Sequence, residues 1–191
     1  MILEGLVTTI APEGTLNLAP MGPIIDPAMR TLILRPFNTS QTYRNLKSHG
    51  EGVFHVTDDV FLLARAAIGE VDPLPPLERA TSILGYHLTD ACRYYEFRVT
   101  KVDDSNERVT MEAEVVHEGS GREFFGFNRA KHLVLEAAIL ATRTAFLPLN
   151  EIAAEYRKWE TVIAKTGGEQ EKEAFALLQR HLARAQEAAR G

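Results

Sequence analysis

The spacing of apolar residues changes once along this chain, close to Phe127. Before that point apolar and polar residues alternate in short runs, as in residues 108–118, where Val109, Met111 and Ala113 share one face. After it, apolar residues recur every three to four positions, which is typical of helices with one buried face. Strands followed by helices predict an α+β chain.

The turn signals divide the first two thirds of the chain into six expected strands. They cover residues 3–10, 15–18, 31–35, 52–57, 91–102 and 108–118, and short helices at 40–48 and 59–68 interrupt them. Three longer helices are expected at 129–146, from Leu149, and after Gly167-Gly168. We therefore expect an antiparallel six-stranded barrel within a domain over residues 1–147, and a C-terminal helical hairpin over 148–191.

The composition argues against several classes of partner and location. The net charge of −5 and the pI near 5.7 argue against a nucleic-acid binder, which needs a basic face. Cys92 is the only cysteine, so no intramolecular disulfide is expected. The start of the chain lacks the pattern of a signal peptide, and no apolar run reaches the roughly 20 residues that span a bilayer. These features predict a cytoplasmic protein without a membrane segment.

Familiar catalytic and metal-binding patterns are missing from the sequence. The six histidines show no recognised ligand spacing, so no metal site is expected. There is no nucleophile elbow and no phosphate-binding P-loop. The adjacent acids Asp58 and Asp59 are better explained as a helix cap and a first-turn acid than as a catalytic pair. The catalytic residues therefore stay unidentified.

One segment combines an arginine with small polar side chains around an expected helix start. Its residues are Arg35, Thr39, Ser40, Thr42 and Asn45. A helix N-terminus offers unpaired N–H groups and a positive dipole end, and arginine binds phosphate through charge-assisted hydrogen bonds. The segment is a candidate phosphate socket. The alternative is that Thr39 or Ser40 merely caps the helix and that the other side chains are solvated.

A second segment, at residues 17–22, could present main-chain groups to a planar heterocycle. It contains Asn17, Leu18, Ala19, Pro20 and Met21, and proline interrupts strand pairing. We expect the strand to end here, with exposed N–H and C=O groups around residues 18–22. The alternative is a plain loop that terminates the strand.

Taken in order, these segments resemble the FMN-binding split-barrel proteins of the flavin reductase-like group, and most closely domain-of-unknown-function family 447. The resemblance rests on residues 5–9, 16–22, 34–37, 40–46 and 53–59 and on the start of the long helix at 127–131. It implies a six-stranded split barrel, a homodimer, and FMN at the subunit interface. It also implies that residues 17–21 line the flavin ring and that the socket residues bind the phosphate and ribityl chain.

The resemblance leaves the reaction open. Many flavin reductases use a histidine from the C-terminal half of the chain near the nicotinamide site, and His117 or His132 could take this place, although neither matches a motif. Asn128 and Lys131 stand where a partner subunit could reach the flavin, and a cation there would stabilise the reduced ring. An N-cap and surface charges are the alternative.

The preferred hypothesis is a homodimeric flavin-dependent oxidoreductase that uses NAD(P)H or another small electron donor. The rivals are an FMN-binding electron carrier or sensor, an interaction protein that has lost the flavin, and an oxidase of the pyridoxamine phosphate type.

Overall fold

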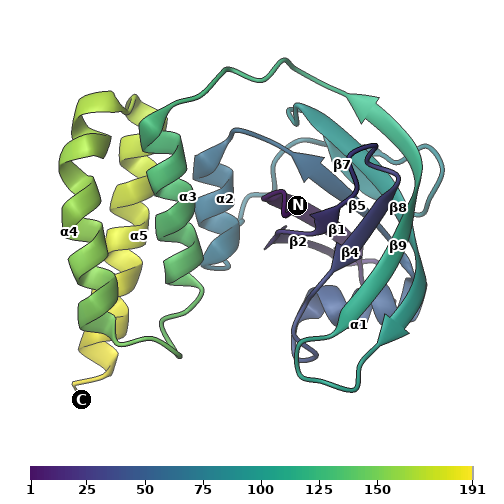
Figure 1. Cartoon of the computed structure of the whole chain (residues 1–191), viewed down its shortest axis with the longest axis horizontal. Coiled ribbons are helices and arrows are strands. Elements are labelled where there is room, and N and C mark those ends of the chain that lie inside the picture. Colours follow the sequence, from purple (N-terminus) through teal and green to yellow (C-terminus); the bar gives the residue numbers. More distant parts are fainter. Residues whose placement is uncertain (191) are drawn as a thin grey trace. The chain divides into compact units, whose positions relative to one another are not determined.

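The computed structural model describes residues 1–190 and divides into two compact units, one built on a β-sheet and one built of helices (Figure 1). The sheet unit comprises residues 1–57 and 73–124. The helical unit comprises residues 58–72 and the chain from Phe125 onward. The expected domain boundary between residues 147 and 148 falls inside the helical unit.

The sheet unit is an antiparallel sheet of seven strands, which confirms the α+β split-barrel expectation but corrects its count of six. The strands run in the order β2-β1-β5-β8-β9-β4-β3. Their bounds are β1 Gly5–Ile10, β2 Leu16–Met21, β3 Ile24–Ile25, β4 Thr31–Leu34, β5 Glu51–Val56, β8 Arg93–Asp103 and β9 Thr110–Ser120. The missed strand is β3, because Gly22 and Pro23 signalled a break and only two residues then pair with β4.

The sheet curls on itself, so that its two ends approach each other (Figure 1). A bridge between Ile2 and Ile24 links the segment before β1 to β3, and the Leu3 N–H donates to the Pro23 carbonyl at 3.1 Å. The hydrophobic core of the unit consists of the buried residues Val7, Ile25, Leu32, Leu34, Leu46, Phe54, Tyr95, Phe97, Val109, Met111 and Ala113.

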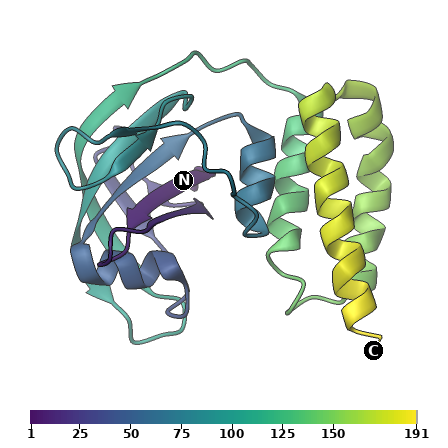
Figure 2. The ribbon, with the colours of Figure 1, turned by 180° about the vertical axis from the view of Figure 1, so that it is seen from behind.

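One helix of the sheet unit, α1 (Gln41–His49), packs against β1 and β2 and lies beside the curled sheet in both ribbon views (Figure 2). Ser40 is its N-cap, with the Tyr43 N–H donating to Ser40 Oγ at 3.2 Å. Gly50 ends the helix in the left-handed conformation that glycine adopts most easily. At this end Lys47 forms an ion pair with Asp104 at 2.6 Å. The helix is thus fixed at both ends.

A two-stranded hairpin, which sequence patterns did not predict, packs against β1 and β5. It consists of β6 Leu77–Arg79 and β7 Tyr86–Leu88. Its strands are only three residues long, too short for an alternation to be read. The loop between them is held by Glu96, a buried carboxylate that accepts hydrogen bonds from the Thr81 and Ser82 N–H groups at 2.7 and 2.6 Å.

His55 is fully buried beside this hairpin. Its Nδ1 is 3.2 Å from the Leu6 carbonyl, and the Leu88 N–H donates to its Nε2 at 3.1 Å. This pair of contacts requires a neutral ring with its proton on Nδ1. Burial lowers the pKa of His55 to about 3, against the smaller opposing effect of the hydrogen bond to Leu6.

The helical unit contains four helices whose apolar faces meet. They are α2 Val60–Ala67, α3 Arg129–Ala141, α4 Leu149–Thr166 and α5 Glu169–Ala188. Helix α3 ends five residues earlier than the expected Phe146, with Thr142 as its C-cap. The N-cap of α2 is Asp59, which was expected as a first-turn acid, rather than Asp58. Of the helices that the structure describes, none is long and apolar enough to cross a membrane.

Candidate functional site

The predicted ring-binding segment lies on the edge strand β2. Strand β2 pairs with β1 on one side only, in a register that places Pro20 opposite Leu6 and Met21 opposite Gly5. The expectation that the strand ends before Pro20 is therefore wrong, because an edge strand tolerates a residue without an N–H. The main chain of residues 17–21 still has one side without a strand partner within the described sheet, which is what recognition by backbone groups requires.

The hydroxyl groups at the start of α1 differ in whether they form hydrogen bonds within the protein. Ser40 Oγ accepts from Tyr43 and donates to the Phe37 carbonyl at 2.7 Å, so it caps the helix, as the alternative interpretation held. Thr39 is exposed, and its carbonyl accepts from Arg44 at 2.6 Å. Thr39 therefore presents its hydroxyl to the surroundings beside the helix start.

Thr42 and Asn45 are buried and face β1 and β2 instead of solvent. Asn17 Nδ2 donates to Thr42 Oγ1 at 3.1 Å and to Thr9 Oγ1 at 3.3 Å. Asn45 Nδ2 donates to the same Thr9 oxygen at 2.9 Å. The structure thus brings the predicted ring segment and the predicted phosphate segment together through Thr9. This residue was missed, because a threonine inside a β-branched strand carries no signal beyond strand propensity.

Arg35, directly after β4, carries an unsatisfied donor. Its Nε atom is buried and has no hydrogen-bond partner anywhere in residues 1–190. Buried side-chain donors are satisfied in the great majority of cases, and an exception points to an absent ion, water or ligand. A phosphate supplies acceptor oxygens and compensates the guanidinium charge, so Arg35 fits the group that the sequence predicts.

Asn128 and Lys131 lie in the helical unit, where both have protein partners. Asn128 caps α3 by accepting from the Lys131 N–H at 3.1 Å, as the alternative interpretation held, and it donates to the Thr166 carbonyl at 2.9 Å. Lys131 Nζ forms an ion pair with Glu171 at 3.0 Å and donates to the Asp58 carbonyl at 2.8 Å. Lys131 is no surface charge, since its side chain is 16% exposed. A role for these two residues at the flavin stays a prediction.

The two histidines considered for catalysis lie in different units. His117 is half-buried on β9, with its ring centroid 6.2 Å from that of Tyr94. His132 is exposed on α3, with its ring 6.0 Å from that of Phe127. Neither contact identifies a proton donor, and no described contact assigns a catalytic residue.

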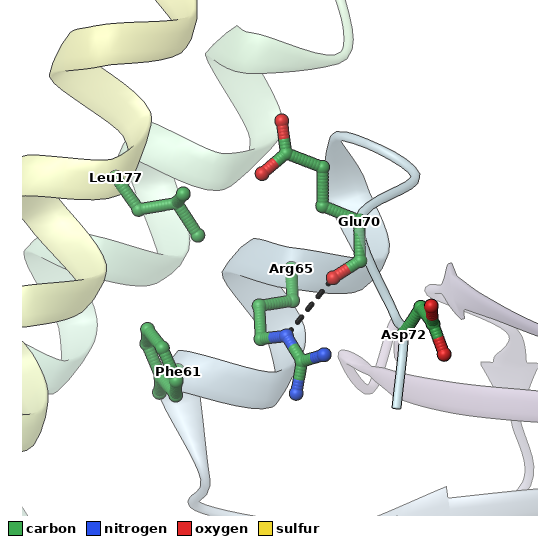
Figure 3. A pocket seen from close by; sticks show the side chains of 5 residues that line it. All are labelled: Phe61, Arg65, Glu70, Asp72 and Leu177. Carbon is green, nitrogen blue, oxygen red and sulfur yellow. Dashed lines mark hydrogen bonds between the residues drawn. The ribbon is translucent and has the colours of Figure 1, made fainter. Parts of the chain in front are cut away.

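The helical unit also has a pocket of about 360 Å³ (Figure 3). Phe61, Arg65, Glu70, Asp72 and Leu177 line it. Arg65 Nε donates to the Glu70 carbonyl at 2.9 Å, and the Glu70 carboxylate accepts from Arg184 at 2.7 Å. The Glu70 charge is thus compensated within the unit.

Comparison with known protein families assigns the chain. The N-terminal domain described as "protein of unknown function (DUF447)" matches residues 3–122, and a second DUF447 domain matches residues 128–180. The chain belongs to the DUF447 family. A comparison with curated proteins finds no match.

Several solved structures share the fold of this DUF447 protein. An FMN-bound DUF447 protein from Methanosarcina mazei is 23% identical, with a TM-score of 0.82 over 94% of each chain. Flavoredoxin from Methanosarcina acetivorans is 11% identical, with a TM-score of 0.55 over 63% of this chain and 69% of that one. Nitrilotriacetate monooxygenase component B from Bacillus cereus is 18% identical, with a TM-score of 0.53 over 63% of this chain and 71% of that one. The fold is therefore that of the flavin reductase-like split barrels.

Proposed function

We propose that this DUF447 protein binds FMN and acts as a flavin-dependent oxidoreductase. The observation that carries the proposal is the buried, unpartnered Nε of Arg35, in the unit that also holds the edge strand β2 and the capped start of α1. The Methanosarcina mazei protein with the same fold over almost the whole chain is FMN-bound, which supports the choice of ligand.

Different residues of the sheet unit would bind different parts of FMN. Arg35 would bind the phosphate, with Thr39 and the first turn of α1 supplying further donors. Asn17–Met21 would offer main-chain groups to the isoalloxazine ring from the free side of β2. Thr42 and Asn45, proposed from sequence as ligands, would act mainly by fixing α1 against β1 and β2. When bound, FMN supplies the transfer of one or two electrons, while the protein supplies binding and orientation.

A homodimer, NAD(P)H as electron donor and a cytoplasmic location belong to the same proposal. The homodimer and the electron donor rest on the resemblance in sequence, and the location rests on the sequence patterns at the start of the chain and in its apolar runs. The second candidate is an FMN-binding electron carrier or sensor, favoured by the likeness to a flavoredoxin and by the lack of an assigned catalytic residue.

The first test is whether the purified protein carries FMN. A yellow protein absorbing near roughly 450 nm, where oxidised flavins absorb, is expected either as isolated or after incubation with FMN. A colourless protein that also takes up no added FMN would sink the proposal. Consumption of NAD(P)H by the FMN-loaded protein then separates an oxidoreductase from an electron carrier. The molecular mass measured in the same preparation tests whether the protein is a dimer.

A further inference from the structure

The hydroxyl of Thr9 lies at the centre of a buried polar network in the sheet unit. Thr9 on β1 stands directly opposite Asn17 on β2, and its Oγ1 accepts from Asn17 Nδ2 at 3.3 Å. The same oxygen accepts from Asn45 Nδ2 on α1 at 2.9 Å. Thr9 and Asn45 are 2% and 0% exposed, so the Asn45 amide cannot exchange the threonine oxygen for bulk water.

The network continues from Thr9 to the first turn of α1. Asn45 Oδ1 accepts from Gln41 Nε2 at 2.6 Å, and Asn17 Nδ2 also donates to Thr42 Oγ1 at 3.1 Å. Gln41 and Thr42 are the first two residues of the helix. One hydroxyl on β1 is therefore joined through two amides to the edge strand β2 and to the start of α1.

Under the proposed function, strand β2 and the start of α1 bind different parts of FMN. The edge of β2 would hold the ring, and the start of α1 would hold the phosphate. A ligand that must engage both at once depends on the distance and angle between them, because a misplaced donor loses most of its hydrogen-bond strength.

We propose that Thr9 is a positioning residue, which fixes the phosphate socket on α1 relative to the ring-binding strand β2 without touching the cofactor. This inference rests on the proposed function. It assigns a role to a residue to which neither the sequence motifs nor the resemblance gave one. It predicts that the hydroxyl of Thr9 contributes to the discrimination of FMN from riboflavin, which lacks the phosphate.

The test compares the dissociation constants of FMN and riboflavin, each measured by quenching of flavin fluorescence. Thr9→Val keeps the shape of the side chain and removes the acceptor. We expect it to lower the preference for FMN over riboflavin by about tenfold, the size that misplacing one charge-assisted contact produces. Thr9→Ser keeps the acceptor and is expected to preserve the preference.

Thr8→Val is the matched control. Thr8 is equally buried and is the neighbour of Thr9 on the same strand, but its hydroxyl donates to the Tyr86 carbonyl at 2.6 Å on the hairpin side. Thr8→Val makes the same chemical change and is expected to alter thermal stability without altering the preference for FMN. Stability alone thus cannot produce the expected result.

The outcomes separate this inference from the function on which it rests. If wild-type protein binds neither flavin, the proposed function and the inference both fall. If wild-type protein binds FMN and folded Thr9→Val keeps the full preference, only the inference falls. Should Thr9→Val not fold, Gln41→Met decides in its place, because it cuts the same network at an exposed residue, and an unchanged preference there overturns the inference.

Discussion

The two units differ in whether any polar residue that the sequence singled out keeps a buried group without a protein partner. In the sheet unit, Arg35 keeps a buried donor without a partner, and the edge of β2 has one free side. In the helical unit, the polar groups of Asn128 and Lys131 bind residues of other helices. The difference teaches that a polar residue at a helix start is a ligand candidate only where the fold leaves its hydrogen-bonding capacity unused.

The largest effect is expected in the helical unit, from Lys131→Met. The variant leaves the Glu171 carboxylate, 8% exposed, without its cation, and an uncompensated buried charge costs about 3 kcal/mol or more. Burial alone would raise the pKa of Glu171, but hydrogen bonds from Lys131 and the Gly168 N–H lower it below its ordinary value. Unfolding in denaturant, followed by fluorescence of the single Trp159 on α4, measures the loss.

Lys131→Met also tests whether the helical unit contributes to FMN binding. FMN affinity is expected to stay within threefold of wild type, since Lys131 has its partners inside the helical unit. Weakening of FMN binding by tenfold or more would instead give Lys131 the role at the flavin that the resemblance implied. Lys158→Met is the matched control, because its pair with Glu155 is exposed and contributes about 0.5 kcal/mol or less.

The next effect is expected at Arg35. Replacing it with alanine removes the donor that the proposed phosphate would satisfy, and hydrogen bonds to charged groups contribute about 2 kcal/mol. FMN affinity should therefore fall by about 30-fold, while riboflavin affinity changes little. Isothermal titration with both flavins makes the measurement.

Arg44→Ala is the control for this experiment, since Arg44 is exposed on α1 and its guanidinium already donates to Thr39 and Gln41. An equal loss of FMN affinity in the two variants would show that net charge, rather than the unpartnered donor of Arg35, attracts the phosphate.

The last effect concerns the stability of the sheet unit in mild acid. The neutral form of His55 is buried, so its folded pKa of about 3 lies below the ordinary value of 6.5, and the unfolded chain takes up the proton first. The contribution is complete above about pH 6.5 and is lost as the pH falls towards 3, by up to about 1.4 kcal/mol per pH unit.

Unfolding free energies between pH 7 and pH 4.5 should therefore decline in wild type and decline less steeply in His55→Asn, whatever the stability of that variant at pH 7. The exposed His49 provides the control, and His49→Gln is expected to keep the wild-type slope. A slope that His55→Asn leaves unchanged would assign the acid sensitivity to other groups.

Local patterns predicted most of the elements. The alternation in β8 and β9, the cap at Ser40 and the starts of the C-terminal helices follow from period, capping and turn chemistry over a few neighbouring residues. The short strands β3, β6 and β7 were missed because two or three residues are too few to show an alternation, and each strand is recognised only by its pairing with the strand next to it in the chain.

The sequence by itself determined the α+β class, the order of the elements and the membership of Arg35 and Asn17–Met21 in candidate binding segments. Tertiary structure alone decided which of the proposed side chains keep free hydrogen-bonding groups. A residue can bind a ligand only through hydrogen-bonding groups that have no partner within the folded protein. Which groups have a partner depends on contacts such as that of Thr9 with Asn45, 36 residues apart in the chain. No local pattern records such a contact, because it exists only once the strand and the helix have packed together.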